Sequence, residues 1–198
     1  MSKHALEVLL DSRPRFKILK FLFRNMERGV TIKDLAEHTQ EDQTTTRKEI
    51  IKLLEIKLLR QEGKKSASAT EYRLNKEFEF FSELRDLILK SSPAEKRHLI
   101  ESINKLGRIK FAAVGGIFMD KESKDPLAVD LMIVVDDPDR RKLQIFLKSL
   151  EAEVGKEIKF AVMDREEFLY RMAMFDRFVR VLLEGPHEKL INRLGVGL

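Results

Sequence analysis

The clearest pattern in the chain lies in residues 43–65, which read QTTTRKEIIKLLEIKLLRQEGKK. Thr46, Ile50 and Leu53 recur there at offsets of four and three, which is the spacing of one face of a helix. We expect that helix to begin near Gln43. The same stretch holds seven basic and three acidic residues. Localised positive charge is what phosphate binding requires, although a solvated helix face has the same composition.

Two further helices are predicted before this basic helix. Phe16, Leu19 and Leu22 recur at the spacing of one helical face. Thr31 is a suitable N-cap for the second helix, and Asp34 falls in its first turn, where a carboxylate is favourable. The basic helix is therefore the third of three.

A β-hairpin is predicted after the basic helix. Strand-like residues 58–61 and 71–74 flank Gly63-Lys64-Lys65-Ser66-Ala67-Ser68, a small, polar, glycine-containing segment that is typical of a hairpin loop. Lys64 and Lys65 lie at its tip. Three helices followed by a basic hairpin is the element order of a winged helix-turn-helix domain.

The outward residues of the basic helix have the chemistry that the major groove of DNA requires. In a helix-turn-helix, the first residues of the last helix contact base edges. Gln pairs with adenine, Arg and Lys pair with guanine, and threonine methyl groups contact thymine methyl groups. We expect Lys52, Lys64 and Lys65 to contact phosphates, which position the protein without reading sequence. The expected base-reading residues are Gln43, Thr44, Thr45, Arg47 and Lys48.

The second half of the chain alternates strand-like and helix-like segments. Ser92-Pro93-Ala94-Glu95 is a strong helix start, because Ser can cap, Pro fits the first helical position and Glu follows Ser by three residues. We therefore divide the chain into residues 1–91, which end in a connecting helix, and residues 92–198. The fold class we expect is α+β, with a mixed sheet in the second domain. The expected strands are 109–114, 128–135, 158–163 and an edge strand at Leu190-Ile191, and the expected helices are 139–154 and 165–183.

Composition excludes several classes of protein. The chain has 198 residues, of which 43% are hydrophobic, and this is too apolar for a disordered protein. It contains no cysteine, so disulfides, thiolate metal sites and cysteine nucleophiles are excluded. The longest apolar run, Phe111–Met119, is too short to span a bilayer, and the N-terminus does not have the pattern of a signal peptide. We expect a soluble, cytoplasmic protein without a membrane partner.

Several motifs of the first half occur together in one known family. They are residues 12–19 (SRPRFKIL), 31–36 (TIKDLA), 44–50 (TTTRKEI), Leu58-Leu59 and 72–75 (YRLN). With these motifs the first half resembles the winged-helix transcriptional regulators. The whole chain resembles such a regulator fused to a minimal nucleotidyltransferase-like domain.

In the second half, Val114-Gly115-Gly116 is similar to the glycine pair that begins the nucleotidyltransferase signature. The family continues with a strand that carries two acidic residues at alternate positions, where both carboxylates face one way and hold Mg²⁺ for phosphoryl transfer. This chain has Asp130, but it has Ala128 in place of the first carboxylate, and alanine cannot ligate a metal. We therefore interpret the second domain as non-catalytic, with no metal site.

Gly115, Gly116 and Asp130 are a nucleotide-binding remnant in one interpretation. In the other, the two glycines only shape a turn at a strand end. Asp130 is then hydrogen-bonded to neighbouring backbone or to a basic group, since a buried carboxylate is costly unless it is paired.

The sequence thus predicts a sequence-specific regulator that binds double-stranded DNA and is not an enzyme. We expect no cofactor. The second domain is expected either to form a homodimer or to sense a small-molecule effector. Two alternatives stay open: an active metal-dependent nucleotidyltransferase that uses Asp130 with a loop acid, and a winged-helix adaptor that binds proteins instead of DNA.

Overall fold

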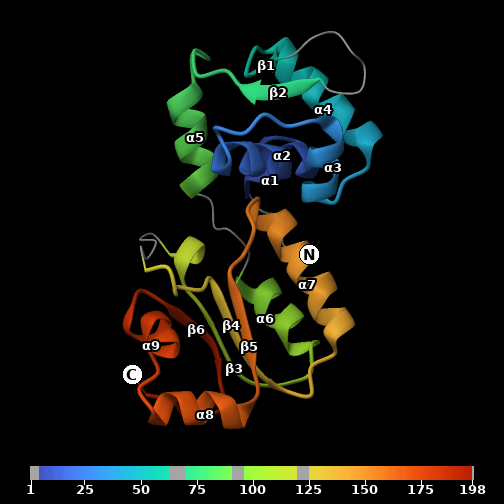
Figure 1. Ribbon diagram of the computed structural model, residues 1–198. Coiled ribbons are helices and arrows are strands. Elements are labelled where there is room, and N and C mark those ends of the chain that lie inside the picture. Colours follow the sequence, from blue (N-terminus) through green and yellow to red (C-terminus); the bar gives the residue numbers. More distant parts are fainter. Residues whose placement is uncertain (1–4, 63–69, 91–95, 120–124, 198) are drawn as a thin grey trace. The chain divides into compact units, whose positions relative to one another are not determined.

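A computed structural model describes residues 5–62, 70–90, 96–119 and 125–197 (Figure 1). Within these ranges the chain is α+β, with nine α-helices, a two-stranded antiparallel sheet and a four-stranded mixed sheet. The expected α+β class and mixed sheet are therefore confirmed. Internal contacts divide the chain into two compact units, residues 1–92 with 149–156, and residues 93–148 with 157–198.

The first unit is a small helical bundle followed by a hairpin and one more helix (Figure 1). Ser12 caps α2 by accepting from the backbone N–H of Arg15, and Pro14 lies at the helix start, where its missing N–H costs nothing. Thr31 and Asp34 form a reciprocal capping box at the start of α3. The elements of this unit are α1 (Ala5–Leu9), α2 (Arg13–Arg24), α3 (Ile32–Thr39), α4 (Gln43–Glu55), β1 (Leu59–Glu62), β2 (Glu71–Leu74) and α5 (Phe81–Lys90).

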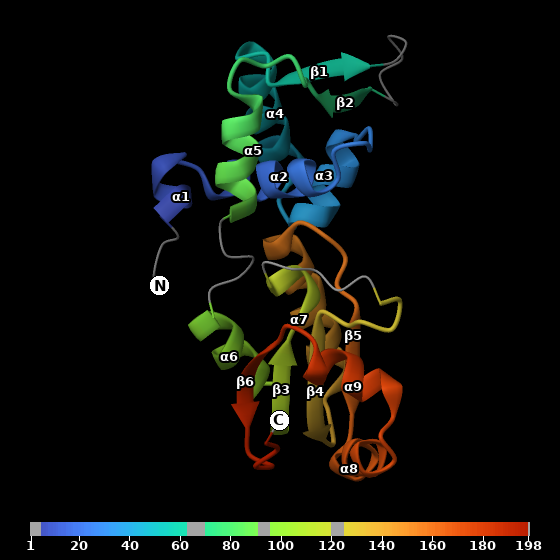
Figure 2. The same cartoon turned by 90° about the vertical axis from the view of Figure 1, so that its left-hand side faces the viewer.

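The second unit is built on a sheet whose strand order is β5-β4-β3-β6. Strand β3 pairs antiparallel with β4 and β6, whereas β4 and β5 are parallel. Figure 2 shows β3 between β4 and β6. The elements of this unit are α6 (Lys96–Asn104), β3 (Arg108–Val114), a short 3-10 helix η1 (Gly116–Phe118), β4 (Leu131–Asp136), the first part of α7 (Arg140–Val154), β5 (Phe160–Met163), α8 (Arg165–Ala173), α9 (Arg177–Glu184) and β6 (Glu188–Asn192).

Helices cover both faces of this sheet. Side chains alternate between the two faces along each strand. One face carries Phe111 of β3, Met132 of β4 and Met163 of β5, which pack with Phe168 of α8 and Leu182 of α9. Helix α6 contacts β3 and β6 and lies on the other side (Figures 1 and 2). Because both faces are buried, β4 is apolar along nearly its whole length.

Three expectations about elements are wrong. The single helix expected over 165–183 is two helices, because Phe175 is left-handed and Asp176 starts α9 by accepting from the N–H groups of Phe178 and Val179. The strand expected from residue 128 begins at Leu131, and the one expected from residue 158 begins at Phe160. Helix α1 was not predicted at all.

No helix in the described part of the chain is both long and apolar enough to cross a membrane.

Candidate nucleic-acid interface

Helix α4 turns one face toward the core of the first unit. Thr46, Ile50 and Leu53 are buried, as the helical spacing in the sequence predicts. Ile50 and Leu53 belong to a hydrophobic cluster that also contains Phe16 of α2 and Leu35 of α3. This packing fixes the rotation of α4 about its axis and therefore decides which of its residues face outward.

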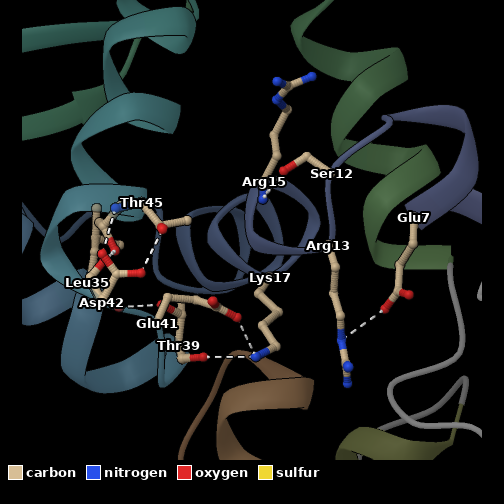
Figure 3. Close-up of polar contacts among 11 residues, drawn as sticks. Glu7, Ser12, Arg13, Arg15, Lys17, Leu35, Thr39, Glu41, Asp42 and Thr45 are labelled. Carbon is tan, nitrogen blue, oxygen red and sulfur yellow. Dashed lines mark hydrogen bonds and ion pairs between the residues drawn. The ribbon is translucent and has the colours of Figure 1, made fainter.

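The start of α4 is held by an N-cap. The carboxylate of Asp42 accepts the backbone N–H of Thr45 at 2.8 Å and its hydroxyl at 2.5 Å (Figure 3). These two bonds hold the pKa of Asp42 below its usual range, and the bond from the Thr45 hydroxyl contributes most to this shift. Thr46 adds a third bond from its hydroxyl to the carbonyl of Asp42 at 2.9 Å. The cap orders the end of α4 that carries the expected base-reading residues.

Lys17 of α2 holds the turn between α3 and α4. Its ammonium donates to the carbonyl of Thr39 at 3.0 Å and to the carboxylate of Glu41 at 2.6 Å (Figure 3). Gln40, between these two residues, has a left-handed backbone with φ of 53°. One cation therefore fixes both sides of the sharp bend that sets the direction of α4.

A buried carboxylate ties α4 to the start of α2. Glu49 accepts Nε of Arg15 at 2.8 Å and the hydroxyl of Ser12 at 3.1 Å. Burial by itself raises the pKa of Glu49, but the hydrogen bond and charge of Arg15, aided by Ser12 and Lys52, hold that pKa below its usual value. The pairing is invisible in the sequence, because Arg15 and Glu49 are 34 positions apart.

The outward face of α4 keeps unpaired positive charge. Arg47 and Lys48 are exposed, and neither forms an ion pair with any residue that the structure describes. Lys52 is exposed too, although its ammonium lies 3.4 Å from Glu49. Among the other expected base-reading residues, Gln43 and Thr44 are exposed, whereas Thr45 is half-buried with its hydroxyl engaged by Asp42.

The hairpin arms present no comparable charge. Arg73 of β2 lies 2.7 Å from Glu62 and 3.8 Å from Glu71, and Arg60 lies 3.5 Å from Glu62. The tip of the hairpin lies outside the described residues. The positions of Lys64 and Lys65, both expected to contact phosphates, are therefore not described.

One residue of this surface was missed in the sequence. Ile51 is 48% exposed on the outward side of α4, four positions after Arg47 and three after Lys48. Helical spacing could have found it, since Ile51 is off the inward stripe of Thr46, Ile50 and Leu53. An apolar side chain therefore interrupts the basic face.

The second group of candidate residues comes together in the other unit, where Asp130 lies beside a tight turn at Gly115 and Gly116, which we call the Asp130 turn. Asp130 is buried, and its carboxylate accepts the backbone N–H of Ile117 and that of Lys159, each at 2.9 Å. Gly115 donates its N–H to the carbonyl of Asp130, also at 2.9 Å. The expectation that neighbouring backbone satisfies Asp130 is confirmed.

Gly116 is required by this turn. Its φ is 49°, and a Cβ at this position would overlap the carboxylate of Asp130. Ala128 and Asp130 both precede β4, so the premise that they alternate along a strand is wrong. In the described part of the chain, no three His, Asp or Glu side chains are grouped so that they could hold a metal ion.

Comparisons with known proteins add nothing to this picture. No protein-family model matches the chain, and it matches neither a curated protein nor a solved structure. What the protein does is therefore inferred from its own residues.

Proposed function

We propose that the chain is a sequence-specific regulator that binds double-stranded DNA through the outward face of α4. The observation that carries the proposal is the pair Arg47 and Lys48, which are exposed and have no ion-pair partner among the described residues. The helix that carries them is fixed by its packing on the core, by its N-cap and by the contacts of Lys17 and Glu49. Arginine and lysine side chains of this kind bind guanine edges and phosphates. The order of α2, α3 and α4 followed by the hairpin of β1 and β2 also agrees with the winged-helix resemblance.

Electrostatics within the first unit support this choice of surface. Arg15, Lys17 and Arg73 all face carboxylates at 2.6 to 2.8 Å, so their charges are used inside the unit. Arg47 and Lys48 of α4, by contrast, have no ion-pair partner among the described residues and are available to an external partner. Double-stranded DNA, with its dense and regular phosphate charge, is the partner that such a surface fits best.

We also propose that the second unit is a non-catalytic relative of the nucleotidyltransferases, which mediates dimerisation or senses a ligand. In support, both oxygens of the Asp130 carboxylate already accept a backbone N–H. Incubation of the full chain with nucleoside triphosphates and Mg²⁺ tests this. We expect no turnover, and turnover that Asp130→Asn abolishes would make the protein an enzyme.

The main test is selection of bound fragments from random duplex DNA by the full chain. We expect an enriched motif, with affinity that falls steeply as salt rises, because cations that contact phosphates release counterions. The double variant Arg47→Ala, Lys48→Ala should lose most of this affinity. Binding that is weak and blind to sequence, or absent at low salt, would overturn the proposal and favour a protein partner.

A further inference from the structure

Ile51 is an exposed branched aliphatic residue within a basic surface. It follows Arg47 by four residues and Lys48 by three, so the three side chains are neighbours on the helix. Thr44 precedes Ile51 by seven residues, or two turns, on the same side of α4. Thr44, the two cations and Ile51 therefore form one stripe along the exposed side of the helix.

The core does not account for this isoleucine. The inward side of α4 is filled by Thr46, Ile50 and Leu53, which are at most 2% exposed, whereas Ile51 is 48% exposed. Leu54, the remaining apolar residue of the helix, packs against the core as a partly buried side chain. Only a partner outside the first unit, or water, can cover Ile51.

The stripe has the dimensions of a groove contact. Thr44 and Ile51 are about 10 Å apart along the helix axis, which corresponds to roughly three base-pair steps of DNA. A helix that places Arg47 and Lys48 against base edges also places Ile51 in the groove. An aliphatic side chain there cannot satisfy the hydrogen-bonding groups of a base edge, and the apolar group that the major groove offers is the C5-methyl of thymine.

We propose that Ile51 is a specificity-determining residue that contacts the methyl group of a thymine in the bound site. The inference rests on the proposed DNA binding by α4 and goes beyond it, since it names one base and one group on that base. Burying about one methyl group changes affinity about four-fold. Cytosine in place of that thymine would lose this contact and also present an amino group to an aliphatic side chain.

The test replaces each thymine of the selected duplex in turn by deoxyuridine, which pairs identically and lacks only the C5-methyl group. For the unmodified full chain we expect one position at which the replacement weakens binding about four-fold. For Ile51→Ala we expect weaker binding to the thymine duplex and no further loss with deoxyuridine at that position. Ile51 is exposed, so this variant should unfold at the same temperature as the parent.

Ile56 offers a matched control. It is also an exposed isoleucine, at 54%, but it lies at the C-cap of α4, off the stripe. Ile56→Ala should keep the four-fold deoxyuridine penalty. Thr44→Ser tests whether Thr44 contacts the thymine methyl group instead of Ile51, because it removes one methyl group from the other end of the stripe.

The outcomes separate the inference from the proposed function. If Ile51→Ala keeps the whole penalty, if Thr44→Ser abolishes it, or if no thymine methyl matters for a duplex that binds tightly, Ile51 does not read thymine although the protein binds DNA. If the unmodified chain selects no duplex even at low salt, the proposed function fails and this inference fails with it.

Discussion

The outward face of α4 and the Asp130 turn differ in how their charged groups are exposed and paired. On α4, Arg47 and Lys48 are exposed and have no ion-pair partner among the described residues. At the turn, Asp130 is buried and both of its carboxylate oxygens accept backbone N–H groups. Unused charge on an exposed face is what recognition of a partner needs, whereas a satisfied buried carboxylate stabilises the fold. The two regions should therefore respond to substitution in different measurements.

The largest effect is expected for Asp130→Ala. The change leaves the N–H groups of Ile117 and Lys159 without their acceptor, and this should lower the free energy of unfolding by about 2–4 kcal/mol. Urea denaturation at neutral pH measures it. Asp130→Asn should lose less, because its amide oxygen still accepts one N–H. A loss below about 0.5 kcal/mol for the alanine variant would mean that the turn does not depend on this carboxylate.

Gly116→Ala tests the same turn by adding a side-chain atom next to the Asp130 carboxylate. It should destabilise the parent protein, since its Cβ would overlap the carboxylate of Asp130. In the Asp130→Ala background the same change should cost less, because the overlap is gone and only the left-handed φ is unfavourable. An equal loss of unfolding free energy in both backgrounds would mean that the left-handed φ at residue 116 causes the whole effect and the overlap with Asp130 causes none.

The next effect concerns DNA and leaves stability nearly unchanged. Arg47→Ala should weaken binding to the selected duplex by roughly 1–3 kcal/mol and relax the preference at one base position. Titration of the duplex, with variants at each base position, measures both quantities. Equal losses on every DNA sequence would show that Arg47 contacts phosphate instead of a base.

Arg85→Ala is a suitable control for Arg47→Ala. Arg85 is an arginine of α5 that already donates to Asp86, at 3.1 and 3.0 Å. Its removal should change DNA affinity by less than about 0.5 kcal/mol. A loss as large as that of Arg47→Ala would extend the interface beyond α4.

Glu49→Gln should cost about 1–2 kcal/mol of stability at neutral pH, because Arg15 loses a charged acceptor at 2.8 Å. The pKa of Glu49 is below the usual 4.5 in the folded protein, so the stabilisation by its carboxylate is complete above about pH 4.5 and is lost as pH falls through the folded pKa. The difference between parent and variant in urea denaturation should shrink over that range. A difference that stays constant down to pH 3 would contradict the assigned role of the charge.

The smallest effect is expected just after α4. Lys57 has a left-handed backbone, with φ of 62°, which glycine adopts without strain. Lys57→Gly should raise the free energy of unfolding by about 0.5–1 kcal/mol. DNA affinity should change less than two-fold, since Lys57 lies beyond the end of the helix. A loss comparable to that of Arg47→Ala would place this lysine in the interface.

The sequence predicted α2, α3 and α4 of the first unit and the buried face of α4, but it did not predict α1. The spacing of Thr46, Ile50 and Leu53 could be read from the sequence because all three lie within one helix, and a helix turns every 3.6 residues whatever surrounds it. The exposed positions Gln43, Thr44, Arg47 and Lys48 follow from the same geometry. The break between α8 and α9 was missed because apolar residues continue through it, and the local cap at Asp176 was overlooked.

The partners of the buried charges could be read only from the tertiary structure. Glu49 meets Arg15 across 34 residues, and Asp130 meets Lys159 across 29, and no periodicity specifies which distant segments come together. The sequence could state that a buried Asp130 needs donors, because desolvating a carboxylate is costly. The packing of η1 and the start of β5 around β4 decided that backbone N–H groups supply them.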